Sequence, residues 1–188
     1  MMGDHGLFAK SVFFEGSAHV PMIIRPPIAS WTTGALQGRQ CDTLVTLADI
    51  MPTVLGIAGI ENNRIKMDGL NLMDFIDTRT EDRIFYGNCS DTYFAVMKDG
   101  FKYMWARQGG GELLFNIAED PMEQNNLRHT SPKIAAEMKQ MLTEHVRQHN
   151  PKLITDGNLT ILPPVTSPRD MAKWPGFHST VYPSDVLH

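Results

Sequence analysis

Four short runs rich in β-branched and aromatic residues, separated by tight turns, constrain the fold of this chain most. Asp99-Gly100 stands between the second and third runs. It is a strong hairpin signal, because a type I′ turn needs positive φ at both central residues. The next turn is Gln108 to Gly111. We expect the four runs to pair as an antiparallel meander, over residues 84–88, 93–98, 101–106 and 112–116.

An amphipathic helix is expected after this meander. Ser131 suits the helix N-cap, Pro132 suits the first helical position, and the segment ends at Pro151. The apolar stripe at helical spacing consists of Ile134, Met138, Met141, Leu142, His145 and Val146. Packing this stripe on one face of the sheet would bury both elements, so this part of the chain predicts an α+β fold.

Two further elements are expected before the meander. Val20 to Arg25 predicts a strand, which two prolines then end. Residues 42–60 predict a core helix with Asp49 at its N-cap, Pro52 in its first turn and Gly59 just after its C-cap.

Composition excludes several classes of protein. Over 188 residues, 42% are hydrophobic and 20% charged, which is typical of a globular protein. A net charge of -4 gives no basic surface for nucleic acid or anionic membranes. Cys41 and Cys89 form no C-x-x-C pair, although a single disulfide stays open. No apolar run approaches the ~20 residues of a spanning helix and the start lacks a signal-peptide pattern, so we expect a soluble chain of undetermined compartment.

The opening stretch places a polar segment, Gly3-Asp4-His5-Gly6, ahead of the predicted strand. Two interpretations stay open on the residues alone. Glycines at both ends and an Asp that bonds its own backbone favour a simple turn. A site loop on a sheet edge is the alternative, because loops hold reactive groups that strands fix in place. The chain opens directly in these residues, which predicts that an upstream part is missing.

Five segments in succession resemble motifs of the sulfatase family. G-D-H-G-L-F-A-K followed by F-F-E-G-S-A-H-V-P is similar to G-x-H-G-x-x-x-K and Y-E-x-S-x-R-V-P. L-A-D-I-M-P-T-V-L-G-I-A-G resembles D-x-x-P-T-x-L-x-x-x-G, and D-G-L-N-L resembles D-G-x-S-L. F-K-Y and G-E-L-L-F-N-I-A-E-D-P-M-E-Q-N-N-L are similar to K-Y, E-L-Y-D-L and D-P-x-E-x-x-N-L. The matches keep the family's order over residues 3–130, so the chain is identified as a member by its C-terminal portion.

The resemblance implies a sulfatase of the alkaline phosphatase superfamily, whose full chain hydrolyses sulfate esters. Such enzymes use a formylglycine made within C-x-P-x-R, and calcium or another divalent ion held by acidic and amide side chains. Neither Cys41 nor Cys89 lies in that motif, and the family's acidic ligands have no counterpart here. We therefore expect no cofactor in this chain and no turnover by it alone, so its status as an enzyme stays open.

The resemblance also makes Asp4-His5-Gly6 the second of two similar family elements, because Lys10 follows His5 by five residues as the family's sulfate-contacting lysine does. Lys10 would then bind a sulfate oxygen and stabilise charge on the leaving ester. His5 would either contact substrate or orient the loop. Lys10 and His5 are thus the candidate catalytic residues, and Lys10 and His178 the candidate substrate contacts, since the tail that contains His178 could fold over the site.

Three other histidines are weaker candidates. His19 stands where the family has Arg in R-V-P. His145 and His149, four residues apart on one helix, could chelate a metal, but the position of His145 on the apolar stripe favours packing.

The sequence therefore predicts the C-terminal portion of a sulfatase. Residues 1–77 would end the large α/β domain with its last strand and helix, residues 78–150 would form the four-stranded sheet and long helix, and residues 151–188 an irregular tail. A non-catalytic module that binds itself or a partner stays open, as does a fragment of a phosphate or phosphonate ester hydrolase. Exposed edges and apolar surface predict a homo-oligomer or a missing N-terminal half. The expected substrate of the full-length family is a sulfate ester, and neither nucleic acid nor membrane is an expected partner.

Overall fold

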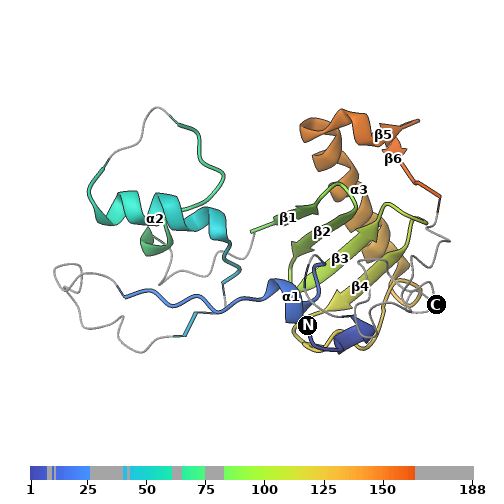
Figure 1. Ribbon diagram of the computed structural model, residues 1–188, viewed down its shortest axis with the longest axis horizontal. Helices are drawn as coiled ribbons and strands as arrows, with labels where there is room; N and C mark the ends of the chain where they lie inside the picture. The colour runs from blue at the N-terminus through green and yellow to red at the C-terminus, as the bar shows by residue number, and fades with distance from the viewer. Residues whose placement is uncertain are drawn as a thin grey trace, which may run out of the picture. The chain divides into compact units, whose positions relative to one another are not determined.

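The computed structural model describes residues 1–7, 10, 12–25, 40–41, 43–60, 65–74 and 83–163 (Figure 1). Its internal contacts divide the chain into two units. The sheet unit contains Met1–Val20, which we call the opening segment, together with the chain from residue 84 onward; the helical unit is Pro21–Arg83. The sequence predicts that the family's large α/β domain ends at residue 77. This domain boundary stays a prediction.

The sheet is the predicted four-stranded antiparallel meander (Figure 1). Its turn at Asp99-Gly100 has φ of 51° and 78°, so the positive values that a type I′ turn requires are present. The strands match the four predicted runs within one residue and are β1 (Phe85–Cys89), β2 (Tyr93–Lys98), β3 (Phe101–Ala106) and β4 (Glu112–Asn116). The mixed α+β class is confirmed.

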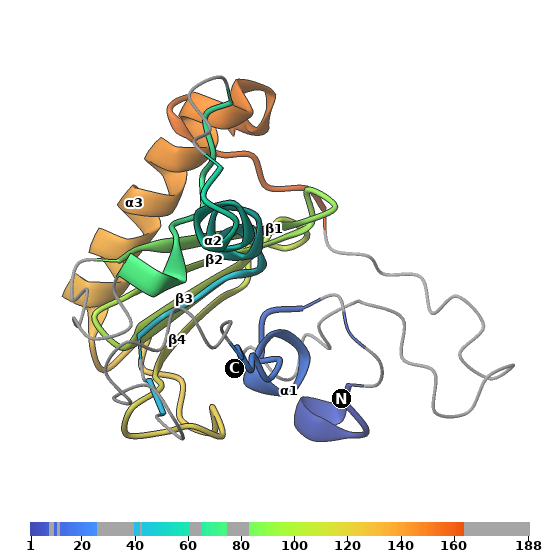
Figure 2. The ribbon, with the colours of Figure 1, turned by 90° about the vertical axis from the view of Figure 1, so that its left-hand side faces the viewer.

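One face of the sheet is covered by α3 (Pro132–His149) (Figure 2). Ser131 stands at its N-cap and its carbonyl accepts the Ala135 N–H, which confirms the predicted start. The residues of this shared core are Phe94, Val96, Tyr103, Trp105 and Leu114 from the sheet, and Ala135, Met138, Leu142 and Val146 from the helix. They alternate along each strand, as a period of two requires.

The opposite face of the sheet is covered by the opening segment. This segment contains a short 3₁₀ turn, η1 (Asp4–Gly6), and a single helical turn, α1 (Glu15–Ala18). Among its described residues the buried apolar side chains are Leu7, Val12 and Phe14, and they pack against Tyr93, Ala95, Met104, Ala106, Leu113 and Phe115. Both faces of the sheet are therefore buried by segments that lie at opposite ends of the unit's sequence.

The strand predicted for Val20 to Arg25 is not formed, which corrects the sequence interpretation. A strand needs a neighbour to receive its backbone hydrogen bonds. The pairings found among the described residues join the strands of the meander, a short hairpin beyond α3, and Gln108 with Leu162 in an isolated bridge, and none of these includes Val20 to Arg25.

The helical unit contains η3 (Leu47–Asp49), α2 (Ile50–Ile57) and η4 (Leu72–Asp74). Asp49 is the N-cap of α2, Pro52 lies in its first turn, and Gly59 follows its C-cap with φ of 66°, all as predicted. The predicted core packing of this helix is not found among the described residues, where Ile50, Met51 and Val54 are exposed.

Asp49 organises this unit, with its carboxylate completely buried. The carboxylate accepts the backbone N–H groups of Thr46 at 2.6 Å and Leu70 at 2.9 Å, and the Arg83 guanidinium. Burial acts to raise the pKa of Asp49, but these hydrogen bonds outweigh it and hold the pKa below its ordinary value. Asp49 and Leu70 belong to the two segments that resemble D-x-x-P-T-x-L-x-x-x-G and D-G-x-S-L. A hydrogen bond therefore joins these two segments.

The tail is more ordered than the predicted irregular segment over its described part. It forms η5 (Pro151–Leu153) and a hairpin of β5 (Ile154–Thr155) and β6 (Asn158–Leu159). The hairpin turns through Asp156-Gly157, again with positive φ at both residues. No helix within the described ranges is long and apolar enough to cross a bilayer.

Candidate functional site

The candidate loop lies in the opening segment, on the face of the sheet opposite α3. Its first element is η1, in which His5 has φ of 52° and the Leu7 N–H donates to the Asp4 carbonyl at 2.9 Å. The Asp4 carboxylate accepts the Met2 N–H at 3.1 Å, and this bond lowers its pKa. Asp4-His5-Gly6 therefore forms a turn, as the simpler of the two interpretations predicts.

The imidazole of His5 is fixed by an aromatic contact. Its ring stacks on the ring of Phe14, with centroids 4.0 Å apart and planes 10° from parallel. Phe14 is itself fully buried against Phe115, at a centroid distance of 6.1 Å. His5 is thus half-buried and held in one orientation on the surface of the sheet unit.

Lys10 is exposed, so its ammonium is open to solvent and to an anion. His178, the other predicted substrate contact, lies outside the described residues, which end at residue 163. The roles of Lys10, His5 and His178 stay predictions.

A buried ion cluster holds the loop just after Lys10. The Lys102 ammonium donates to the Phe13 carbonyl at 2.9 Å, to the Glu123 carboxylate at 2.9 Å and to the Glu15 carboxylate. Glu123 also accepts the Glu15 N–H at 2.6 Å. The side chains of Lys102 and Glu123 are each 1% exposed. We call Lys102, Glu15 and Glu123 the Lys102 cluster.

The turn that presents Glu123 is built by Asp120. Its carboxylate accepts the N–H groups of Gln124 at 3.1 Å and Asn125 at 2.7 Å. Burial acts to raise the pKa of Asp120, but these bonds outweigh it and lower the pKa. Glu123 has φ of 55°, a left-handed conformation that the turn enforces.

Sequence inspection missed the Lys102 cluster. Each member lies in a resembled motif: Glu15 in F-E-G-S, Lys102 in F-K-Y and Glu123 in D-P-M-E. The available signal was a lysine inside an otherwise apolar strand, because a charge buried in a sheet needs a partner from elsewhere in the chain. The motif positions alone do not show that the three side chains meet.

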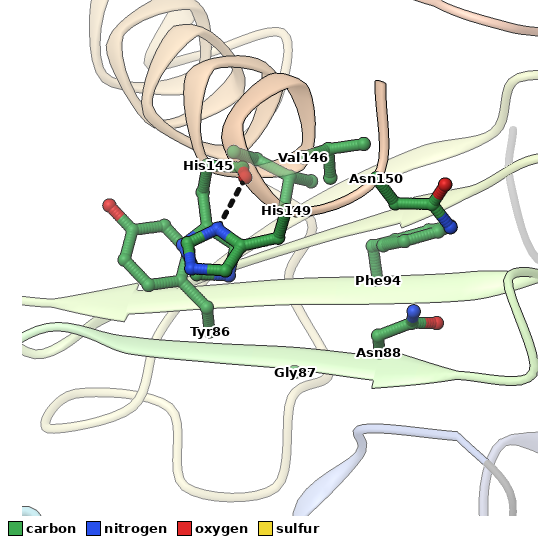
Figure 3. Close-up of a pocket in the computed structure, with 9 residues that line it drawn as sticks. Tyr86, Gly87, Asn88, Phe94, His145, Val146, His149 and Asn150 are labelled. Carbon is green, nitrogen blue, oxygen red and sulfur yellow. Dashed lines mark hydrogen bonds between the residues drawn. The ribbon is translucent and has the colours of Figure 1, made fainter. Parts of the chain in front are cut away.

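His145 and His149 pack as an aromatic stack (Figure 3). The His145 ring lies 3.9 Å from the Tyr86 ring and 4.2 Å from the His149 ring, between centroids. His149 Nδ1 is 2.8 Å from the His145 carbonyl oxygen. A cavity of about 80 Å³ adjoins the stack, lined in part by Asn88 and Asn150. This geometry favours the packing interpretation over metal chelation.

The described residues do not fit a calcium site. Calcium takes six to eight oxygen ligands. Within the described ranges, no three His, Cys, Asp or Glu side chains gather closely enough to hold an ion. Cys41 and Cys89 are both free thiols, the first exposed and the second half-buried.

Residues 3–150 match the family described as N-sulphoglucosamine sulphohydrolase, C-terminal. This chain belongs to the sulfatase family. The sulfatase assignment, made from five short motifs, is confirmed over a range that contains the opening segment from Gly3 onward, the helical unit, the sheet and α3.

Relatives agree with this assignment. The chain is 38% identical over 134 residues to an arylsulfatase of Clostridium perfringens, covering 68% of this chain and 27% of that protein. It is 31% identical to a choline-sulfatase of Rhizobium meliloti over 68% of this chain and 25% of that protein. The chain thus spans about a quarter of the length of these relatives.

Solved structures give a weaker likeness. The phosphonate monoester hydrolase of Agrobacterium radiobacter aligns over 60% of this chain and 27% of that chain, with 21% identity and a TM-score of 0.45. The sulfatase relatives favour the sulfatase interpretation over the phosphonate hydrolase and the non-catalytic module.

Proposed function

We propose that this sulfatase C-terminal portion supplies the sulfate-contacting loop of a sulfuric ester hydrolase, with Lys10 as the contact. The observation that supports this most is the joint arrangement of the opening segment: Lys10 is exposed, while His5 before it and Glu15 after it are both held on the sheet unit. A cation that is free to meet an anion on a loop held at both sides suits charge stabilisation.

The chemistry assigned to this chain is electrostatic. The Lys10 ammonium would donate to a sulfate oxygen and offset the negative charge that develops on the leaving ester oxygen. His5 would orient the loop, because its ring is engaged with Phe14. Calcium or another divalent ion is proposed for the rest of a full-length protein, where it would offset the charge of the sulfate.

The first test measures turnover by the chain itself. Nitrophenyl sulfate is incubated with this chain and with Lys10→Ala. We expect no hydrolysis above the Lys10→Ala background, because C-x-P-x-R does not occur in the chain. Hydrolysis above that background would contradict the proposed absence of independent turnover.

The second test asks whether Lys10 acts in a complete active site. Residues 3–150 replace the matching region of the Clostridium perfringens arylsulfatase, and hydrolysis of nitrophenyl sulfate is measured. We expect activity, and a loss of about 100-fold or more in kcat/KM with Lys10→Ala, as for removal of one charge-stabilising donor. Lys66→Ala, which removes an exposed lysine of the helical unit, should leave kcat/KM unchanged. Equal rates with and without Lys10 would disprove the contact, and a folded but inactive chimera would contradict the function.

A further inference from the structure

Three consecutive residues of the opening segment, Phe13 to Glu15, each contact β3, β4 or the turn after β4, which lie far from them in the sequence. The Phe13 carbonyl accepts the Lys102 ammonium of β3. The Phe14 ring packs 6.1 Å from Phe115 of β4. Glu15 is bound at both its N–H and its carboxylate. Backbone and side chains of this stretch are therefore fixed in a single register against the sheet.

The hydrogen bonds of Lys102 are complete only when this stretch is in place. A lysine ammonium has three N–H donors, and Lys102 has three acceptors. Two of them, the Phe13 carbonyl and the Glu15 carboxylate, belong to the opening segment. Because a buried ammonium is strongly destabilised without partners, docking of the opening segment and satisfaction of Lys102 are one event.

Lys10 lies between the two points at which the opening segment is held. On its N-terminal side His5 stacks on Phe14, and on its C-terminal side Phe13 and Glu15 bind Lys102. Phe14 connects the two points, since its ring contacts His5 while its chain neighbours contact the cluster. Movement of Phe13–Glu15 would consequently displace His5 as well.

We propose that the Lys102 cluster is a positioning device for the anion-contacting loop, with Lys102 acting on Lys10 through Phe13–Glu15 and His5. The inference rests on the proposed function, in which Lys10 binds sulfate. It assigns to the small C-terminal sheet a role in the geometry of the site, in addition to its role in the fold. Lys102 itself contacts no substrate and is a positioning residue.

The test uses NMR of the full chain. His5 ring protons, stacked at 4.0 Å on Phe14, should resonate upfield through the ring current, and this shift reports a docked loop. The Trp105 indole resonance, from a side chain buried on the opposite face, reports the sheet. Titration with inorganic sulfate should shift the Lys10 resonances.

Three variants are compared. Lys102→Met removes the ammonium and keeps the apolar stem. Lys102→Met combined with Glu123→Gln also removes the buried negative charge that would be left without a cation, so this variant folds more readily. Lys139→Met is the matched control, because it removes a lysine that donates to Glu112 at 2.6 Å on the α3 face without touching the opening segment.

We expect both Lys102 variants to lose the upfield His5 shift and to weaken the sulfate response at Lys10 at least tenfold, while the Trp105 resonance persists. The control should keep all three signals. Retention of the His5 shift and of the sulfate response in both Lys102 variants would overturn the proposal. Loss of the Trp105 signal in both would also overturn it, because the cluster would then be a part of the core alone.

Failure of the proposed function has a different signature. A wild-type chain with the upfield His5 shift but no sulfate response at Lys10 would contradict the role of Lys10. The His5 shift in the variants would then decide the positioning role by itself.

Discussion

The two faces of the sheet are buried in different ways. The α3 face is covered by a regular helix that contributes Ala135, Met138, Leu142 and Val146. The opposite face is covered by an irregular segment whose described residues contribute the buried apolar side chains of Leu7, Val12 and Phe14. On this second face the Lys102 cluster also joins the segment to the sheet through hydrogen bonds.

The difference teaches how each face obtains its specificity. Apolar burial is non-directional, and a helix can satisfy it with any stripe of suitable size. The Lys102 ammonium instead requires acceptors at fixed points. The face covered by the irregular segment therefore gains a defined register from charged hydrogen bonds, and a loop that presents Lys10 requires such a register.

The largest expected effect comes from Phe14→Ala on the opening-segment face. Phe14 is fully buried, and a core Phe→Ala change costs about 3–5 kcal/mol. We expect amide exchange to accelerate most within Met1–Val20 and less within β2 and β3, measured by hydrogen exchange with mass spectrometry. Equal acceleration in both regions would show that the two faces unfold together.

Leu142→Ala tests the α3 face. Leu142 is 1% exposed, so we expect a loss of about 2–5 kcal/mol in the free energy of unfolding, measured by urea denaturation. Exchange should accelerate across the whole sheet, because the larger core contributes to every strand. Gln140→Ala, at an exposed position of the same helix, should change stability little. A cost for Leu142→Ala no larger than for this control would contradict the assigned core.

Gly87→Ala probes the packing of the opening segment on β1. An added Cβ would lie 2.7 Å from Cζ of the Phe13 ring, closer than van der Waals contact allows. Overpacking of this kind costs about 1–3 kcal/mol, and the ring must move to relieve it. Thermal unfolding measures the cost. Unchanged stability would mean that the Phe13 ring is not held against this strand.

The smallest expected effect is the acid dependence contributed by Asp120. Its pKa is lower in the folded protein than the ordinary 3.8, so its contribution to stability is present above that pH and is lost as the pH falls through the folded pKa. Asp120→Asn should therefore lose less stability than the wild type between pH 5.5 and pH 3, by urea denaturation at both values. A parallel loss in both proteins would contradict the assigned cause.

Much of the sheet unit could be predicted because its signals are local. Asp99-Gly100 predicted a hairpin that the positive φ values confirm, and the apolar spacing after Ser131 predicted α3. Asp156-Gly157 in the tail is the same dipeptide, and the structure forms a hairpin there in place of the expected irregular segment. The prediction of a strand at Val20 to Arg25 was wrong, because a strand forms only where a partner strand pairs with it, and the local pattern does not show whether one is present.

The sequence by itself determined the family, the four strands, α3 and the spacing that makes Lys10 the residue to test. Those features depend on backbone conformation and on periodicity within a few residues of each other. Only the tertiary structure decided that the opening segment covers the second face of the sheet and that Lys102 meets Glu15 and Glu123. The physical reason is distance along the chain: Glu15 and Lys102 are separated by 87 residues, and no local pattern specifies which buried charge will find which partner.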